Sequence, residues 1–286
     1  MHTYLHIHFN KTIKKILNNN TLNMVLIAIS GGQDSMCLIQ LMEDFKKNYQ
    51  NIYSINIEYI YIDHQWKKDS KSQIQHLINF IKNKQSSISI YQIKYITASE
   101  LTARYLRYKT LINHALKHKH MTILTAHSQT DKIETFFQQL MRGTSIDGAT
   151  SLSNCRNIHK QLKIFRPLID INRVDINWFC RKFYLPIWSD ITNYDNNINR
   201  NRLRNEFIPY LRKYFMQNLE HQINTFLETC NIDNEYIKQN TIKLYLISRH
   251  KNNIALNYSL IKKQHIAIQA RALQLFFLSS SKCIFK

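Results

Sequence analysis

Residues 24–35 read MVLIAISGGQDS, six apolar residues followed by a loop that holds two adjacent glycines. The apolar run has the length of a strand and is typical of a parallel strand buried on both faces. The chain has four glycines in 286 residues, whereas an average chain of this length has about 20. Where glycine is this scarce, we expect it where the backbone takes positive φ or lies against a ligand. Residues 30–35 are therefore the first candidate for a binding site.

The glycine loop, residues 30–35, has the character of a phosphate-binding turn. Its glycines let backbone N–H groups face an anion, and the helix expected from Met36 onward adds its dipole. Ser30 and Ser35 supply hydroxyl donors. Asp34 is itself an anion, so its place here indicates a Mg²⁺ between the carboxylate and the phosphates. The Gly-Lys-Ser/Thr ending of a Walker A loop is missing, and the alternative is an ordinary tight turn between strand and helix.

Strand and helix patterns alternate along the first half of the chain. The expected strands cover residues 24–29, 52–62, 88–96 and 121–126, and the expected helices cover residues 36–45, 69–84, 98–119 and 130–141. This alternation predicts an α/β fold, in which a parallel sheet has helices on both faces. Ligands in such sheets bind beyond the carboxyl ends of the strands. We therefore expect four residues that follow strands to meet at one edge: Ser30, Asp63, His64 and His127.

The pattern changes near residue 150. Helical periodicity dominates from there, apart from a polar loop expected over residues 190–201, and residues 196–286 hold 14 Lys and Arg against 5 Asp and Glu. A chain of this length commonly has one domain of about 200 residues and a smaller second one. We expect a catalytic domain over residues 1–212 and a small basic helical domain over residues 213–286.

The composition narrows the class of protein. The net charge of +20 favours a polyanionic partner, because binding releases counterions from phosphates; the alternative is that AT-rich coding DNA enriches Lys and Asn. No apolar run approaches the roughly 18 residues that span a bilayer, and the start of the chain does not resemble a signal peptide or an import leader. Five cysteines without a CxxC pair indicate free thiols in a reducing compartment. They disfavour a zinc site or an iron–sulfur cluster, because thiolate ligands usually come in closely spaced pairs.

The glycine loop resembles the PP-loop of the ATP pyrophosphatase superfamily, whose members split ATP into AMP and pyrophosphate and adenylate a substrate oxygen. Segments spread over about residues 24–211 resemble one family within it, the tRNA(Ile)-lysidine synthetases. The matching segments are Ile62-Asp63-His64, Asp69-Ser70, Glu100 with Ala103-Arg104 and Arg107-Tyr108, residues 125–135 (TAHSQTDKIET), Arg142-Gly143, Asp147-Gly148, Arg166-Pro167-Leu168, residues 190–195, residues 200–204 and Pro209.

One position departs from the family pattern. The family has an acidic pair after the histidine, whereas this chain has Thr130 and then Asp131, with Lys132 in place of the frequent Gln. No carboxylate role therefore carries over to position 130. Similar variants occur among cyanobacterial-type members, which indicates a plastid-encoded protein of the chloroplast stroma. An AT-rich bacterial symbiont, with the protein in its cytoplasm, is the alternative.

The resemblance implies an activity and its residues. With ATP and Mg²⁺, the family ligates L-lysine to C2 of the wobble cytidine in isoleucine tRNA with a CAU anticodon, which gives lysidine, AMP and pyrophosphate. The implied ATP-binding residues are Ser30, Gly31, Gly32, Gln33, Asp34, Ser35, Asp63 and His64. Those implied for catalysis are Asp34, which would also hold Mg²⁺, His127, Asp131 and Glu134. Those implied for contact with lysine or tRNA are Arg104, Arg107, Arg142, Gly143, Arg200, Asn201 and Arg204.

Several of these residues also have plainer interpretations. His127 fits a strand-end histidine bonded to the backbone, and Arg104 fits an exposed salt bridge. The arginines of residues 200–204 fit an internal ion-pair network with the acidic side chains of residues 190–195 as well as a contact with tRNA. Asp63, Asp131 and Glu134 are equal candidates for recognising the lysine amine and accepting its proton.

Three other functions compete with lysine ligation. The first is another PP-loop tRNA-modifying enzyme, such as a thiolation enzyme, although the paired cysteines of that class are missing. The second is a non-catalytic basic RNA-binding module with a vestigial nucleotide loop. The third is a small-molecule amidating synthetase, which the high positive charge disfavours.

Overall fold

The computed structural model divides the chain into two compact units. The first unit comprises Met1–Gln138 and Leu152–Glu220, and the second comprises Gln139–Ser151 and His221–Lys286. The boundary expected between residues 212 and 213 stays a prediction about domains, but the packing groups Gln139–Ser151 with the later helices. The structure describes residues 3–18, 24–63, 70–93, 100–158, 162–188 and 198–284.

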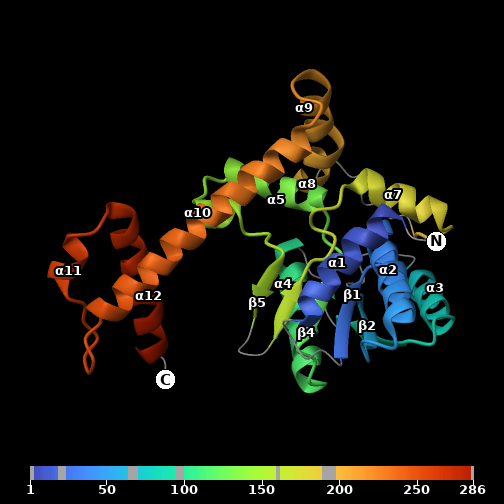
Figure 1. Cartoon of the computed structure of the whole chain (residues 1–286), viewed down its shortest axis with the longest axis horizontal. Coiled ribbons are helices and arrows are strands. Elements are labelled where there is room, and N and C mark those ends of the chain that lie inside the picture. The colour runs from blue at the N-terminus through green and yellow to red at the C-terminus, as the bar shows by residue number, and fades with distance from the viewer. Residues whose placement is uncertain are drawn as a thin grey trace. The chain divides into compact units, whose positions relative to one another are not determined.

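A six-stranded sheet lies at the centre of the first unit (Figure 1). Its order is β3-β2-β1-β4-β6-β5, and each neighbouring pair is parallel except β5 and β6. β1 and β4 are adjacent, so the residues that follow them emerge side by side at the carboxyl edge. The strands are β1 (Met24–Ile29), β2 (Asn56–Asp63), β3 (Ser87–Gln92), β4 (Thr122–Thr125), β5 (Cys155–Asn157) and β6 (Lys163–Phe165).

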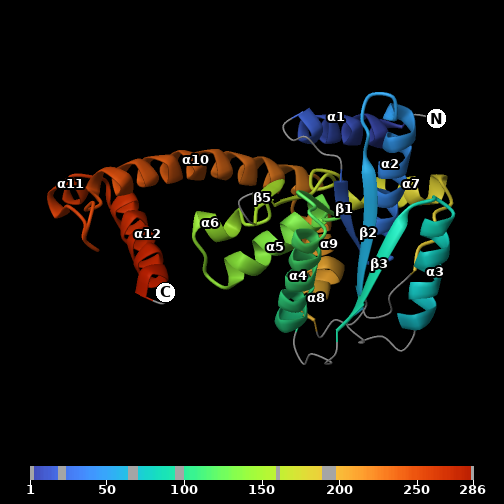
Figure 2. The ribbon, with the colours of Figure 1, turned by 90° about the horizontal axis from the view of Figure 1, so that it is seen from below.

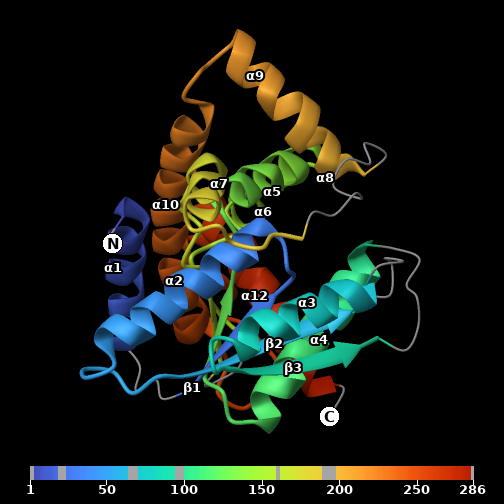
Figure 3. The same ribbon diagram turned by 90° about the vertical axis from the view of Figure 1, so that its right-hand side faces the viewer.

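Helices cover both faces of this sheet, and alternate residues of β1 point to opposite sides. Val25, Ile27 and Ile29 face one hydrophobic core, to which four helices contribute. Leu26 faces the other core, which α4 (Glu100–Lys117) covers. Figures 2 and 3 show the sheet between these two layers, which confirms the expected α/β fold. The four helices on the first face are α1 (Tyr4–Asn18), α2 (Gln33–Tyr49), α3 (Ser70–Lys82) and α7 (Arg173–Lys182).

The expected elements exist, with shifted ends. β2 begins at Asn56 rather than near Ile52, because Ile52 stands in the exposed turn that follows α2. The sequence analysis did not include α1, β5 or β6. The helix α1 does carry an amphipathic pattern, since Leu5, Phe9 and Ile13 recur every fourth residue and are all buried.

Further helices complete the first unit. α5 (Gln129–Met141) follows β4, and its last residues belong to the second unit. Later come α8 (Asn199–Arg202), a π-helical turn (Leu203–Phe207) and α9 (Ile208–Tyr214). The loop expected over residues 190–201 is therefore wrong for its last three residues, which form a helix because Leu203 and Ile208 beyond them are buried in the unit. Residues 190–197 lie outside the described residues.

The second unit is helical, and a carboxylate links its parts. Asp147 accepts a hydrogen bond from Asn234 at 3.0 Å, and Lys238 Nζ and Arg271 Nη2 lie 2.5 and 3.6 Å from its oxygens. Burial raises the pKa of Asp147, but Lys238 and Asn234 hold it below its ordinary value. Within the described residues, no helix has the length and apolar character needed to cross a membrane. The helices are α6 (Ile146–Ala149), α10 (Leu219–Ser248), α11 (Tyr258–Lys262) and α12 (Ile266–Ile284).

Candidate active site

The glycine loop connects β1 to α2 at the carboxyl edge of the sheet. The N–H of Ser30 donates to Ser35 Oγ at 3.0 Å, and the two hydroxyl oxygens lie 2.9 Å apart. Gly31 has a φ of +78°, and a Cβ added there would lie 2.7 Å from Nε2 of Gln73. Glycine is needed at this position both for the backbone conformation and for space, as the sequence predicted.

Groups from other elements hold the loop from behind. Gln73 on α3 is buried and donates its Nε2–H to the Ser30 carbonyl at 2.7 Å, and the Trp188 N–H donates to the Gly31 carbonyl at 3.1 Å. Gly32 precedes α2 and provides no side-chain cap for the first turn. The loop carbonyls are thus taken by protein donors, whereas the first amides of α2 are left for a ligand. This turn favours an anion such as a phosphate.

Asp34 stands in the first turn of α2 with one carboxylate oxygen unused. Oδ1 is buried and has no hydrogen-bond partner in the part of the chain that the structure describes. Burial and the Asp131 carboxylate raise the pKa of Asp34 to about 6, against the opposite effect of Arg173, Arg204 and Gln33. A buried carboxylate with too few partners is stabilised by a bound cation. This position therefore fits a divalent ion that prefers oxygen ligands.

Arg173, the first residue of α7, belongs to the site although the sequence analysis did not include it. Its charge lowers the pKa of Asp34, and its Nη1 is buried with no hydrogen-bond partner among the described residues. The available signal was an arginine at the start of a helix, where a cation opposes the helix dipole. A guanidinium whose buried Nη1 has no partner in the described part of the chain is suited to bind a phosphate oxygen.

Asp131 and Glu134 on α5 form a buried cluster with Arg200 and Arg204, which we call the Arg–carboxylate cluster. Arg200 donates to Asp131 Oδ1 at 2.7 Å and to Glu134 Oε2 at 2.8 Å. Arg204 donates to the same Asp131 oxygen at 3.1 Å and to the two Glu134 oxygens at 2.5 and 2.9 Å. The Glu134 side chain is fully buried, whereas those of Arg200 and Arg204 are 23% and 20% exposed.

The fourth oxygen of the cluster's two carboxylates is also engaged. Asp131 Oδ2 accepts from the N–H and the hydroxyl of Ser128 at 2.9 and 3.2 Å. Burial alone raises the pKa of Asp131, but Arg200 and Arg204 help to hold it at about 2. The internal network considered for these arginines therefore exists, but its partners lie on α5. The acidic residues of 190–195, which the sequence analysis proposed, lie outside the described residues.

His127 follows β4 and is held by Thr125, whose Oγ1 lies 2.9 Å from Nδ1 of the ring. Burial lowers the pKa of His127 to about 4, Asp131 opposes this effect, and cations including Arg166 and Arg104 add to it. The imidazole is therefore neutral near pH 7. It offers a ligand a hydrogen bond at Nε2 rather than a positive charge.

Ser30, Asp63 and His127 follow or end the adjacent strands β1, β2 and β4, so the expected convergence at one edge is confirmed for these three. Asp63 is 5% exposed, and His64 lies outside the described residues. On α4, Arg104 and Arg107 are exposed.

Three further predicted site residues do not follow a strand of the sheet. Asn201 is buried on α8, between the two arginines of the Arg–carboxylate cluster. Arg142 and Gly143 are exposed and belong to the second unit. Gly143 has a φ of +70° and open space around its Cα, so its backbone conformation accounts for the glycine. The roles assigned to these residues stay predictions.

Residues 5–211 match the model of the PP-loop domain family. The chain is therefore a PP-loop protein of the ATP pyrophosphatase class. The glycine loop, residues 30–35, lies within the matched residues, and we call it the PP-loop from here on. This class uses ATP, which agrees with a phosphate-binding turn at the start of α2.

Similar proteins match nearly the whole chain. "tRNA(Ile)-lysidine synthase, chloroplastic" of Gracilaria tenuistipitata var. liui is 51% identical, over 96% of this chain and 86% of its own. The protein of the same name from Pyropia yezoensis is 37% identical, over 97% of this chain and 83% of its own. "tRNA(Ile)-lysidine synthase" of Nostoc sp. is 33% identical, over 95% of this chain and 82% of its own. This chain belongs to the tRNA(Ile)-lysidine synthase family.

A solved structure shares the fold. The U34-tRNA thiolase NcsA from Methanococcus maripaludis, with its [4Fe-4S] cluster, has a TM-score of 0.61 and 15% identity, over 78% of each chain. At this identity the likeness shows the fold alone. Among the described residues, Cys37 and Cys180 are buried, Cys155 is exposed, and no group of three possible metal ligands includes a cysteine.

Proposed function

We propose that this protein uses ATP to ligate L-lysine to C2 of the wobble cytidine in the CAU anticodon of isoleucine tRNA, with release of AMP and pyrophosphate. The observation that carries the proposal is the 51% identity, over 96% of the chain, to a relative named for this activity. The site supports it, because a phosphate-binding turn, the unused Asp34 oxygen and a neutral histidine lie at one edge of the sheet.

ATP binds with its phosphates on the PP-loop. The first amides of α2 and the hydroxyls of Ser30 and Ser35 donate to phosphate oxygens. The unused Oδ1 of Asp34 fits Mg²⁺, which supplies positive charge to the phosphates and to the leaving pyrophosphate when it is bound. Arg173, whose positive charge lowers the pKa of Asp34, adds a further positive charge for the phosphates.

The reaction has two halves. The C2 oxygen of the cytidine attacks the α-phosphorus of ATP, so an O–P bond forms while the bond to pyrophosphate breaks. The lysine ε-amine then attacks C2, so a C–N bond forms, the C–O bond to AMP breaks and the amine releases its proton to solvent. His127 donates a hydrogen bond from Nε2 to a phosphate oxygen. Because its pKa is about 4 in the ligand-free protein, the ring is neutral at pH 7 when ATP arrives.

The Arg–carboxylate cluster positions its arginines rather than accepting a proton. All four oxygens of Asp131 and Glu134 already accept hydrogen bonds, and an Asp131 with a pKa of about 2 is a poor base. The cluster instead holds Arg200 and Arg204 at the site, where their partly exposed guanidiniums bind phosphate or the lysine carboxylate. We assign recognition of the lysine ammonium to Asp63 at the end of β2.

The tRNA binds through its phosphates and its unstacked wobble base. The net charge of +20 supports broad phosphate contact, and an anticodon-loop base leaves its stack at low cost. We assign the basic helical domain, residues 213–286, to contact with tRNA. Affinity is then expected to fall steeply between 50 and 200 mM salt, by roughly 10³ for six or more phosphate contacts. A flat salt dependence would contradict this part of the proposal.

The chloroplastic and cyanobacterial relatives support a place in a plastid or in a bacterial cytoplasm. Within that range, we propose a plastid-encoded protein that acts in the stroma. Detection of its gene in purified plastid DNA tests this proposal, and its absence there together with a nuclear copy would overturn it.

One assay tests the function. The purified protein is incubated with ATP, radiolabelled L-lysine and either of the two tRNAs that carry a CAU anticodon, those for isoleucine and methionine. We expect label in the isoleucine tRNA only, with AMP and pyrophosphate released in equal amounts. Binding of tRNA without lysine incorporation would favour an RNA-binding module, and sulfur incorporation would favour a thiolation enzyme.

A further inference from the structure

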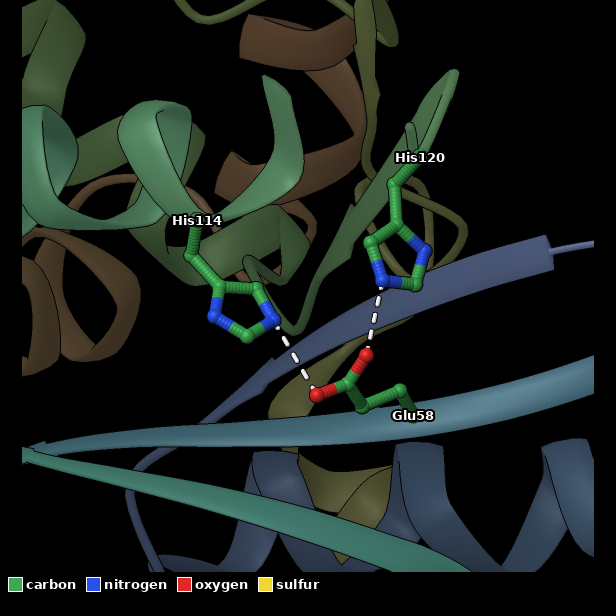
Figure 4. Close-up of side chains that lie close together, drawn as sticks. All are labelled: Glu58, His114 and His120. Carbon is green, nitrogen blue, oxygen red and sulfur yellow. Dashed lines mark hydrogen bonds and ion pairs between the residues drawn. The ribbon is translucent and has the colours of Figure 1, made fainter. Parts of the chain in front are cut away.

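A second cluster of ionisable side chains lies on the first unit, remote from the PP-loop. Glu58 comes from near the start of β2, His114 from the last turn of α4, and His120 from the segment just before β4 (Figure 4). His120 and the start of β4 stand at the amino edge of the sheet, whereas the PP-loop leaves β1 at the carboxyl edge. No step proposed for lysine ligation uses these three residues.

The three side chains converge on one point. Glu58 Oε1 lies 3.0 Å from Nε2 of His114, and Glu58 Oε2 lies 2.8 Å from Nε2 of His120. Both histidine side chains are 1% exposed and that of Glu58 is 18% exposed. One ligand atom from each residue lies within 4.8 Å of the other two. Among the described residues, these three therefore form a group that could hold a metal ion.

His114 and Glu58 form a close, buried ion-pair contact, in which Nε2 of His114 lies 3.0 Å from the carboxylate oxygen. On the opposite side of the ring, Nδ1 lies 2.9 Å from the Tyr91 hydroxyl. If Nδ1–H donates to Tyr91, the lone pair of Nε2 faces the carboxylate, and this arrangement is stabilised by a cation between them.

We propose that Glu58, His114 and His120 bind one Zn²⁺ ion. Two imidazoles and one carboxylate are a ligand set that zinc accepts, with the fourth position left to water on the exposed side of Glu58. Zinc–ligand bonds of about 2.0–2.2 Å place tetrahedral ligand atoms roughly 3.4 Å apart, and one ligand atom from each of the three residues already lies within 4.8 Å of the other two. The site needs no thiolate and is therefore independent of the cysteines.

The surroundings of the three ligands suit a metal. Ser89 donates to Glu58 Oε1 at 2.7 Å and orients the carboxylate. Tyr91 orients His114 in the same way, as a second-sphere partner commonly does for a zinc-bound histidine. The ion would fasten α4 and β4 to β2, which is a structural role.

Zinc titration of the purified full chain, first stripped of metal with a chelator, tests the proposal. We expect one Zn²⁺ per chain bound at this cluster at saturation, and a raised melting temperature. Replacing zinc with Co²⁺ should give the visible absorption of four-coordinate cobalt with nitrogen and oxygen ligands. His114→Gln and His120→Gln should each weaken zinc binding by at least about tenfold.

Two further variants keep the test decisive. Tyr91→Phe removes only the hydroxyl beside His114 and should weaken zinc affinity by about tenfold without unfolding the protein. His221→Gln, at an exposed histidine on α10, is the matched control and should bind zinc as the wild type does. A wild type without a saturable site, or equal zinc affinity in Tyr91→Phe, His120→Gln and the wild type, would overturn the proposal. Neither outcome bears on lysine ligation.

Discussion

Asp34 and Asp131 occupy equivalent places in two neighbouring regions of the first unit. Each stands in the first turn of a helix that follows a central parallel strand, Asp34 on α2 after β1 and Asp131 on α5 after β4. The pKa of Asp34 is raised to about 6, whereas that of Asp131 is lowered to about 2. The difference arises from partners, because Asp131 has two guanidiniums and Ser128 while Asp34 has an unused oxygen.

Two carboxylates whose environments drive their pKa values apart usually have different tasks. The region around Asp34 leaves one carboxylate oxygen without a hydrogen-bond partner among the described residues, which suits a site that binds a cation and phosphates. The region around Asp131 uses its charge within the protein, which fixes two arginines in place. Similar positions on similar elements thus provide a binding group in one case and a scaffold in the other.

The largest effect is expected from Asp34→Asn. The amide keeps the shape of the side chain but loses the charge that holds the cation, so lysine incorporation should fall about a thousandfold, or about 4 kcal/mol of transition-state stabilisation. Binding of tRNA, measured by filter retention, should change less than about threefold. Asp175→Asn, at an exposed acid in the first turn of α7, is the matched control. Comparable activity in Asp34→Asn and wild type would remove the metal role.

Arg204→Ala should show that the other region is a scaffold. It leaves the fully buried Glu134 with an incompletely paired charge, and breaking one partner of a buried pair costs about 3–5 kcal/mol. Urea unfolding measures this loss. Arg202→Ala is the control, because Arg202 pairs with Glu206 on an exposed surface and contributes about 0–1 kcal/mol. Equal losses in the two variants would mean that the cluster does not stabilise the fold.

The pH dependence of stability should have opposite signs at the two carboxyls. Because the pKa of Asp34 is raised, its contribution to folding stability is fully present below pH 3.8, the ordinary pKa of the group. This contribution is lost as the pH rises through about 6. Because the pKa of Asp131 is lowered, its contribution to folding stability is present above pH 3.8 and is lost as the pH falls through about 2. At pH 7.5 without nucleotide, Asp34→Asn should therefore stabilise the protein by up to about 3 kcal/mol.

Asp131→Asn should instead destabilise the protein at pH 7.5, by about 2 kcal/mol from the loss of its favourable ionisation. Chemical unfolding of the wild type and both variants at pH 5 and pH 7.5 gives the comparison. The difference between Asp34→Asn and the wild type should grow over this interval. Destabilisation by Asp34→Asn at pH 7.5 would show that its carboxylate is satisfied within the protein.

The smallest effect is expected at two glycines that share positive φ. Gly31→Ala meets Nε2 of Gln73 at 2.7 Å, whereas Gly143→Ala meets open space. Both changes strain the backbone by about 1 kcal/mol, and only the first also displaces a side chain that holds the PP-loop. Gly31→Ala should thus lower the melting temperature further and weaken ATP binding. Equal effects on stability and ATP binding would mean that Gln73 yields without disturbing the loop.

Much of the fold was predictable because its signals are local. Residues 24–29 form a continuous apolar run, and two of the four glycines follow it directly, so the strand, the turn and the helix start were fixed within a dozen residues. The amphipathic spacing of Leu5, Phe9 and Ile13 was equally local, and α1 was within reach of the same reasoning. β5 and β6 have three residues each, which is too few for a periodic signal.

The partners of the site residues were less predictable, because they depend on which elements meet. The arginines on α8 and the π-helical turn were expected to pair near themselves in sequence, but they reach Asp131 and Glu134 on α5, separated by about 70 positions. Arg173 joins the site only because α7 packs beside α2. Glu58, His114 and His120 come from three elements and have no spacing that a motif search recognises.

The most direct measurement is a crystal structure of the full chain with a non-hydrolysable ATP analogue and Mg²⁺. We expect the triphosphate along residues 30–35, a cation at Oδ1 of Asp34, and Arg200 and Arg204 still bound to Asp131 and Glu134. A nucleotide bound elsewhere, or a triphosphate on the PP-loop with Asp34 turned away from any cation, would contradict the account.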